Sequence, residues 1–440
     1  METDDTIVAI ATPMGVGGVG VIRLSGERAL TIAERLLEEK PQEIKPRIVY
    51  HGWIMDADEV MYAYMKSPKS YTGEDVVEVN CHGGAAVLKK ILKMCIEAGA
   101  RPARPGEFTK RAFLNGRMDL AQAEAVLEII QARTDKGVEV AAKQLGGGLS
   151  NETKRIREEI FNILIKIEAA IDFPEETEEP RMLEIWDEIN TIKNEIEKLE
   201  KTASYGKALK EGVKAAIIGK PNVGKSSLLN RLTEDDRAIV DESPGTTRDT
   251  IEEVINIEGV PVVLVDTAGI RMPTGEVEGK GIKRAKEAAK EAEVVLLVLD
   301  ASSAQMSGED KEAIAAAEGK RIIWILNKVD LGKRLNEEGI EISCKTGEGI
   351  GGLKKKIYDI IIGEENRPNG RPILITERHY NCTRRAWEAL ERALRERRTK
   401  SIELIAADLK EAIEAMDEIK GKRMSDEIIE KIFAKFCIGK

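Results

Sequence analysis

The first part of the chain alternates short apolar runs with amphipathic stretches. Runs rich in branched apolar residues at 6–11, 19–24, 48–54, 60–65 and 76–81 predict β-strands. In 26–37 and 85–98, apolar residues recur at every third or fourth position, which predicts helices. Residues 1–118 are therefore expected to form an α+β domain.

The rest of the chain has two helical regions on either side of an α/β region. From 119 to about 201 apolar residues keep a helical period, as in the stripe Ile156, Ile160 and Ile163. Strand and helix patterns then alternate in 213–361, as a mostly parallel sheet requires. Helical periodicity returns after a turn-rich segment at 367–370.

These patterns predict a helical domain in two parts, 119–210 and 364–440, and an α/β domain at 211–363. Because the termini of a compact domain are often neighbours, insertion of the α/β domain into one helical domain is favoured. Two separate helical domains are the alternative.

Composition narrows the class of protein. A length of 440 residues suggests two or three domains, and the net charge of −10 argues against a chain that grips nucleic acid unaided. No apolar run reaches the roughly 20 residues of a membrane span, and no signal peptide is visible. Five scattered cysteines are typical of reduced thiols, so we expect a cytoplasmic protein with no membrane partner.

A phosphate-binding motif opens the α/β region. Residues Gly219 to Ser226 match G-x-x-x-x-G-K-[ST] between a strand-like run and a helix-like run, which is the context the motif requires. Its backbone N–H groups and the following helix N-terminus favour phosphate. Lys225 is expected to reach the β- and γ-phosphates, and Ser226 to bind Mg²⁺.

Two downstream motifs complete the expected phosphate site. Asp266 ends a buried strand and is placed to hold Mg²⁺ through water, while the N–H of Gly269 can sense the γ-phosphate. Between these motifs, Thr247 is offered as the switch ligand to Mg²⁺.

The base is selected by Asn327-Lys328-Val329-Asp330. The Asp330 carboxylate would accept hydrogen bonds from the N1–H and N2–H₂ groups of guanine, which adenine lacks. With adenine bound, the unpaired carboxylate would weaken the binding free energy by roughly a few kcal/mol. These four motifs together predict a GTP-hydrolysing enzyme. Its predicted nucleotide contacts are Asn222, Val223, Gly224, Lys225, Ser226, Ser227, Gly245, Thr246, Thr247, Asp266, Thr267, Ala268, Gly269, Asn327, Lys328, Asp330, Ser343, Cys344 and Lys345.

The group that orients the attacking water is less evident from the motifs. Ile270 follows Asp-x-x-Gly where many Ras-like GTPases have Gln, and it cannot polarise water. Glu278 is a candidate, although spacing alone favours a solvated loop charge. The amide of Asn222 suits either a monovalent cation or a hydrogen bond within the loop.

Beyond the GTPase motifs, the chain resembles the MnmE (TrmE) family of tRNA-modifying GTPases from end to end. The segments that carry the resemblance are Asp5–Ala9, Gly17–Gly26, Tyr71–Asp75, Cys81–Gly84, Arg104–Thr109, Arg111–Arg117, Ile171–Glu176 and Phe436–Lys440.

The resemblance implies several roles. The N-terminal domain should form a homodimer and bind a tetrahydrofolate derivative (5,10-methylene or 5-formyl) through Arg23, Glu78, Arg117 and Lys440. A K⁺ ion should be held by Asn222, Asp241, Ser243 and Thr246, and Mg²⁺ by Ser226 and Thr247. Glu278 takes the water-orienting role, so the implied catalytic residues are Glu278, Lys225, Thr247 and Cys437.

The family reaction adds an aminomethyl or carboxymethylaminomethyl group to C5 of the wobble uridine (position 34) of certain tRNAs. It implies K⁺-stimulated GTP hydrolysis with dimerisation of the GTPase domains. It also requires an FAD-dependent partner, MnmG (GidA), in a heterotetramer. FAD enters only through that partner, because Gly15–Gly20 matches G-x-G-x-x-G but precedes a strand-like run, not a helix.

Some features keep more than one interpretation. Cys437 fits a prenylation motif poorly, and both a chemical role near folate and a packed helix-end thiol stay open. Cys81-His82 lacks the second pair that a zinc site needs. The alternative functions are a regulatory GTPase switch in ribosome assembly and a folate-dependent enzyme that uses GTP only for regulation. A basic RNA-binding segment, which the first would favour, is not visible after the GTPase region.

Overall fold

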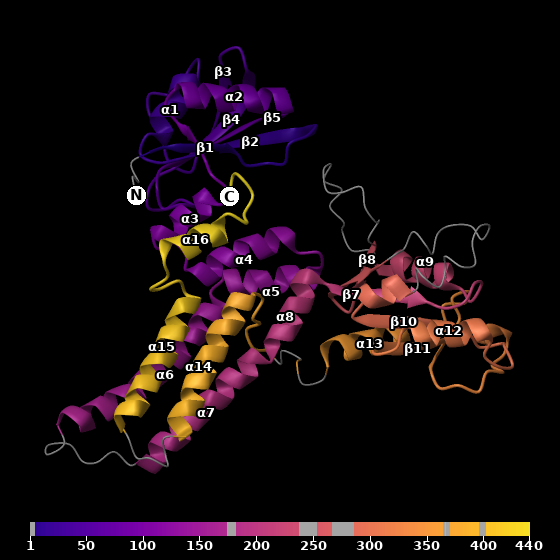
Figure 1. Ribbon diagram of the computed structural model, residues 1–440. Helices are drawn as coiled ribbons and strands as arrows, with labels where there is room; N and C mark the ends of the chain where they lie inside the picture. The colour runs from indigo at the N-terminus through magenta and orange to yellow at the C-terminus, as the bar shows by residue number, and fades with distance from the viewer. Residues whose placement is uncertain are drawn as a thin grey trace. The chain divides into compact units, whose positions relative to one another are not determined.

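The computed structural model describes residues 5–173, 182–236, 253–265, 286–363, 366, 370–395 and 402–440 (Figure 1). By compactness the chain divides into two units, Met1–Leu127 with Asp417–Lys440, and Glu128–Met416. The predicted domain boundaries at 118, 210 and 363 stay predictions.

The first unit is built on a six-stranded sheet in the order β3-β4-β5-β2-β1-β6. All neighbouring strands pair antiparallel except β1 and β6, which are parallel. The five strands predicted from apolar runs are present in the sheet. The strands are β1 Ile7–Ile10, β2 Gly17–Ser25, β3 Val49–Ile54, β4 Asp58–Met65, β5 Val76–Gly83 and β6 Arg101–Pro102.

Helices cover both faces of this sheet. The two predicted helices, α1 Ala29–Leu36 and α2 Ala85–Glu97, pack their apolar stripes on one face. On the other face Phe108, from α3 Glu107–Leu114, packs against β1. Helix α16, Asp426–Phe433, belongs to this unit, and the Phe433 ring lies tilted against that of Phe113 of α3, with ring centroids 6.2 Å apart.

The helices of the second unit come from both sides of the α/β segment. Helix α7, Met182–Glu200, precedes that segment and α14, Glu377–Arg395, follows it, yet the two pack side by side (Figure 1). Lys193 of α7 pairs with Glu391 of α14 at 2.8 Å. The α/β segment is therefore inserted into a helical bundle, as predicted. The helices are α4 Leu120–Gln131, which begins in the first unit, α5 Asp135–Leu145, α6 Gly148–Asp172, α7 Met182–Glu200, α8 Thr202–Glu211, α14 Glu377–Arg395 and α15 Ile402–Ile419.

The inserted segment is a six-stranded sheet in the order β12-β11-β10-β7-β9-β8. Every pairing is parallel except β8 with β9, so the predicted mostly parallel sheet is confirmed. Its strands are β7 Val213–Ile218, β8 Glu253–Ile257, β9 Val260–Leu264, β10 Val294–Asp300, β11 Arg321–Asn327 and β12 Ile340–Ile342.

Each face of this sheet has its own apolar core. Helices α9 Lys225–Asp236 and α13 Ile350–Ile362 bury leucines and isoleucines on one face. Helix α12, Gly308–Ala316, and the helical residues 286–291 bury alanines on the other. Among the described helices, none has both the length and the apolar character of a membrane span.

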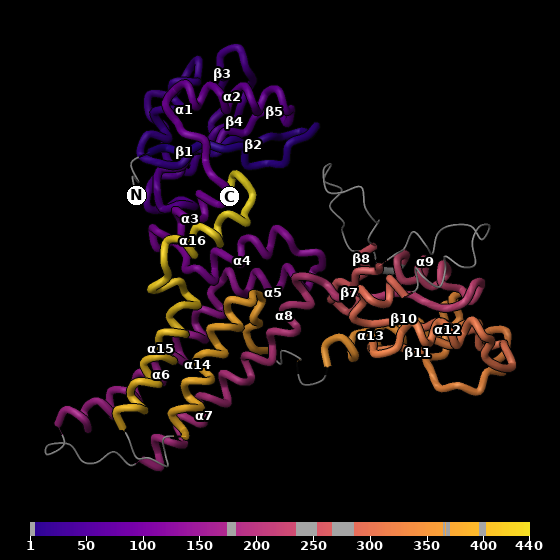
Figure 2. The backbone as a smooth tube through the Cα atoms, in the orientation of Figure 1, coloured from indigo at the N-terminus to yellow at the C-terminus, as the bar shows by residue number. Residues whose placement is uncertain are grey.

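Both described flanks of the inserted segment meet at helix α8 of the bundle, which leads directly into β7 (Figure 2). Helix α8 leads into β7, and residues 373–375, which follow the segment, lie against α8. The N–H of Leu374 donates to the buried Thr202 hydroxyl at 3.1 Å. A Cβ at Gly206 would lie 2.0 Å from the carbonyl oxygen of Leu374, so this approach requires glycine.

Replacing Gly206 by alanine should therefore destabilise the protein by about 1–3 kcal/mol, because the new methyl group overpacks this contact. Gly351 is the control, since a Cβ there meets nothing within 4 Å and the residue lies in helix α13. Gly351→Ala should leave the free energy of unfolding unchanged or raise it by up to about 1 kcal/mol. Denaturant unfolding measures both variants, and equal effects would contradict the packing described.

Candidate active site

The predicted phosphate loop connects the buried strand β7 to the first turn of α9. The Lys225 amine turns back onto this loop and donates to the carbonyl oxygens of Gly219 and Lys220, at 2.7 and 2.8 Å. Burial lowers the pKa of Lys225. The amine is thus held at the loop that the sequence motif predicts to bind phosphate.

Asn327, at the end of β11, ties this loop to the base-selecting motif. Its side chain is 2% exposed, and its amide nitrogen donates to the Val223 carbonyl at 2.8 Å. Its amide oxygen accepts from the N–H of Cys344 at 3.1 Å. A Cβ at Gly224 would lie 2.3 Å from the Asn327 amide nitrogen, so glycine is required for this contact.

The predicted guanine-selecting carboxylate is oriented by a neighbouring loop. The hydroxyl of Ser343, which is fully buried, donates to Asp330 at 2.7 Å. The same hydroxyl accepts from the N–H of Thr346 at 3.2 Å. Asp330 is exposed, and the adjacent Cys344 thiol is buried, which raises its pKa to about 11. Residues that follow the neighbouring strands β11 and β12 therefore meet at one edge of the sheet.

Two ion pairs that the sequence analysis missed support these loops. Lys328 pairs with Asp300, at the end of β10, at 2.7 Å. Burial would raise the pKa of Asp300, but hydrogen bonds from Lys328 and Ser302 outweigh it and hold the pKa below its ordinary value.

The second pair joins Lys220 of the phosphate loop to Asp310 at 2.8 Å. Asp310 also forms a reciprocal capping box with Ser307 at the start of α12. The spacing Ser-x-x-Asp is a local signal for this cap, but it gives no indication of the pairing with Lys220.

The remaining predicted nucleotide contacts divide into two groups. Ser226 and Ser227 lie exposed in the first turn of α9, Lys345 is exposed beside Cys344, and Asn222 is exposed with a φ of 61°. The others lie outside the described residues, as do Glu278 and three of the four predicted K⁺ ligands, Asp241, Ser243 and Thr246. These are Asp241, Ser243, Gly245, Thr246, Thr247, Asp266, Thr267, Ala268, Gly269 and Glu278.

A second cluster, in the first unit, gathers residues expected to bind folate. Arg23 on β2 and Glu78 on β5 are register partners, and two guanidinium nitrogens lie 2.7 Å from the same carboxylate oxygen, Oε1. The third guanidinium nitrogen donates to the Gly439 carbonyl at 2.9 Å. Burial, together with the charge of Arg23, lowers the pKa of Lys440. Three of the four predicted folate residues are therefore brought together.

Aromatic rings lie beside this cluster. The Arg23 guanidinium lies 5.5 Å from the ring centre of Tyr71 and 5.7 Å from that of Phe108. Arg117, the fourth predicted residue, donates to the Ser70 carbonyl at 3.0 Å, directly before Tyr71. The two rings were not among the predicted site residues, because isolated aromatics give no signal in sequence.

Cys437 lies in the segment that leads to Lys440. Its side chain is exposed, and its carbonyl accepts from the N–H groups of Gly106 and Lys440, at 3.3 and 3.4 Å. The thiol is therefore not packed for burial in this unit.

Two protein-family models together match most of the chain. A family model described as the MnmE helical domain matches residues 120–437, and one described as the GTP-binding protein TrmE N-terminus matches residues 6–117.

Curated relatives match over their full length. The chain is 42% identical over 460 residues to the tRNA modification GTPase MnmE of Clostridioides difficile (strain 630), with 100% of both chains covered. It is 41% identical over 455 residues to the protein of the same name from Syntrophus aciditrophicus (strain SB), covering 99% of each. A third, from Alkaliphilus metalliredigens (strain QYMF), is 41% identical over 462 residues with 100% of both covered.

Proposed function

The chain belongs to the MnmE (TrmE) family of tRNA modification GTPases, and from this we propose that it uses GTP hydrolysis to modify the wobble uridine of certain tRNAs. The observation that carries the nucleotide part is the arrangement of Asp330, Ser343 and Asn327. An oriented carboxylate selects guanine, because it accepts from two N–H groups that adenine does not offer.

The phosphate loop fits a magnesium-bound triphosphate. The Lys225 amine, now held by two loop carbonyls, is within reach of β- and γ-phosphate oxygens bound in the same loop. The N-terminus of α9 adds a partial positive charge there. Ser226 of this turn and Thr247 would hold Mg²⁺, which neutralises the charge that develops on the phosphates.

We further propose a K⁺ ion at Asn222, with Asp241, Ser243 and Thr246 as further ligands and Glu278 orienting the attacking water. The support from the described residues is Asn222 itself, an exposed amide residue within the phosphate loop whose backbone is left-handed. A cation there would supply the positive charge that stabilises the negative charge developing on the phosphates in the transition state. Other GTPases use an arginine for this purpose.

GTP turnover should therefore fall by about tenfold or more when K⁺ is replaced by Na⁺ at equal ionic strength, since one preorganised charge is lost. Phosphate release under saturating GTP and Mg²⁺ measures this. Asn222→Ala should show equal, low rates in both salts. Equal turnover of the unaltered chain in both salts would rule out the proposed ion.

The second cluster fits a tetrahydrofolate derivative as the one-carbon donor. The Glu78 carboxylate can accept hydrogen bonds from the N–H groups of a pterin. Arg23 and Lys440 would attract acidic groups of the ligand. The rings of Tyr71 and Phe108 beside Arg23 offer apolar surface to a flat heterocycle. Arg117 on the neighbouring loop is the fourth proposed contact.

Glu78→Gln should weaken binding of 5-formyltetrahydrofolate to the full chain by about 10- to 100-fold, because it removes charge-assisted hydrogen bonds. Glu59→Gln is the control, since Glu59 is exposed on the adjacent strand β4 and pairs with His51. Isothermal titration calorimetry measures both. Unchanged affinity in Glu78→Gln would place folate elsewhere, and GTP affinity should stay constant throughout.

The proposed reaction adds an aminomethyl or carboxymethylaminomethyl group at C5 of uridine 34, together with the FAD-dependent partner MnmG (GidA). Needing a partner agrees with the net charge of −10, which disfavours unaided binding to tRNA. We also propose that the chain acts as a homodimer through its N-terminal unit.

A bacterial strain deleted for its own family member should lose the wobble-uridine modification and regain it when this chain is expressed. Lys225→Ala should not restore it, because triphosphate binding is impaired. Mass spectrometry of tRNA nucleosides provides the measurement. Normal modification in the deletion strain would favour a regulatory role, such as the ribosome-assembly switch considered above.

A further inference from the structure

The hairpin formed by β8 and β9 contacts the helical bundle at its tip. Its two-residue turn consists of Glu258 and Gly259, with φ values of 51° and 89°, as a type I′ turn requires. The Thr134 hydroxyl, just before α5, donates to the Gly259 carbonyl at 2.7 Å. A residue far from the GTPase motifs therefore holds part of the GTPase sheet.

The contact at Thr134 is tightly defined. Thr134 is 6% exposed and is also the N-cap of α5, where its oxygen accepts from the N–H of Gly137 at 3.2 Å. Its single hydroxyl proton is therefore used by Gly259. A Cβ at Gly259 would lie 2.8 Å from the Cβ of Lys136, so the two backbones approach closely.

An apolar core continues beneath this hydrogen bond. Val140 and Ala141 of α5 belong to the same buried cluster as Ile257 and Val260, which flank the hairpin turn. Because packed cores transmit displacements, a shift of the hairpin would act on α5.

The position of the hairpin in the chain links it to the nucleotide. Strand β8 follows the segment that contains Thr247, and β9 leads to Asp266. Both residues are proposed to act at the Mg²⁺ and phosphates. The turn held by Thr134 therefore connects the ends of β8 and β9 that are farther in sequence from Thr247 and Asp266.

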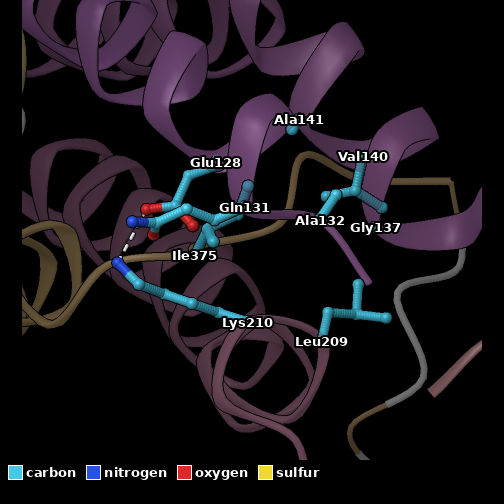
Figure 3. A pocket seen from close by; sticks show the side chains of 9 residues that line it. All are labelled: Glu128, Gln131, Ala132, Gly137, Val140, Ala141, Leu209, Lys210 and Ile375. Carbon is cyan, nitrogen blue, oxygen red and sulfur yellow. Dashed lines mark hydrogen bonds and ion pairs between the residues drawn. The ribbon is translucent and has the colours of Figure 1, made fainter. Parts of the chain in front are cut away.

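A pocket lies beside the contact, between α5, α8 and the end of α4. Figure 3 shows Glu128 and Lys210 facing each other there, and they pair at 2.6 Å. Lys210 belongs to α8, which leads into β7. The same small region thus connects α4 to the helix that enters the GTPase segment and, through Thr134, to the hairpin.

We propose that Thr134 is a positioning residue for GTP turnover. By fixing the hairpin turn it restricts β8 and β9, and through them the residues that complete the phosphate site in the transition state. The same contact passes the nucleotide state to α5 and the end of α4. This inference rests on the proposed GTPase function, but it assigns a role to a residue outside the nucleotide site.

The test compares full-length Thr134→Ala and Thr134→Ser. Thr134→Ala should lower kcat for GTP by about two- to tenfold, the effect of one lost hydrogen bond. Its Kd for a non-hydrolysable GTP analogue should stay within about twofold, because the phosphate and base loops are untouched. Thr134→Ser keeps the hydroxyl and should restore kcat. Thr376→Ala is the matched control, since Thr376 accepts the N–H of His379 at the start of α14 and does not contact the hairpin.

A second pair of variants keeps the proposal testable if Thr134→Ala folds poorly. Gly259→Ala disturbs the same contact, whereas Gly319→Ala imposes similar left-handed strain at a φ of 78° where no atom is crowded. Only Gly259→Ala should lower kcat.

Hydrogen–deuterium exchange provides an independent readout of the coupling. Amides of α5 should exchange differently with GDP and with the GTP analogue in the unaltered chain, and this difference should vanish in Thr134→Ala. A normal kcat in Thr134→Ala, or an α5 insensitive to nucleotide, would overturn the inference while GTP hydrolysis stands. Failure of the unaltered chain to hydrolyse GTP would instead refute the proposed function.

Discussion

The amide side chain of Asn327 joins two loops that must act on one ligand. One of its hydrogen bonds holds the phosphate loop at Val223, and the other holds the base loop at Cys344. Because Asn327 is buried at the end of a central strand, both bonds are protected from water, and losing either would leave a buried polar group unpaired. One residue therefore ties together the two loops that are proposed to bind the triphosphate and the guanine. The ion pairs Lys328–Asp300 and Lys220–Asp310 reinforce the same arrangement from its sides.

Insertion of this segment into a helical bundle places the proposed nucleotide site in contact with helices that come from both sides of it in the sequence. The segment is connected where α8 enters it and where residues 373–375 leave it, and it is also held at the β8–β9 turn by Thr134. These three places of contact are where the proposed coupling between the nucleotide site and the helices would have to act.

The sequence motifs and most secondary-structure elements were predictable, because each of them lies within a short stretch of the chain. The phosphate loop, the strand before it and the base motif each lie within a few residues, so spacing alone reveals them. Most strands were predictable because their buried residues are branched and apolar, whereas the two-residue strand β6, Arg101–Pro102, has no such signal. The pairs Lys220–Asp310 and Thr134–Gly259 were not, since each joins segments about a hundred residues apart in the chain. Helical periodicity likewise does not say which core a helix joins, and so the packing of α16 on α3 was not foreseen. The predicted roles of Glu278 and Thr247 remain untested, because both residues lie outside the described part of the chain.

If Asp330 selects guanine as proposed, then tRNA modification should follow the nucleotide specificity of this one carboxylate. Asp330→Asn replaces an acceptor by an amide, which can donate to the carbonyl that xanthine carries in place of the guanine amine. The measurement is formation of modified wobble uridine in an extract of the deletion strain, supplied with the purified variant and one nucleoside triphosphate. We expect modification with xanthosine triphosphate and little with GTP, the reverse of the unaltered chain. Modification by the variant with GTP alone, or by the unaltered chain without any triphosphate, would contradict it.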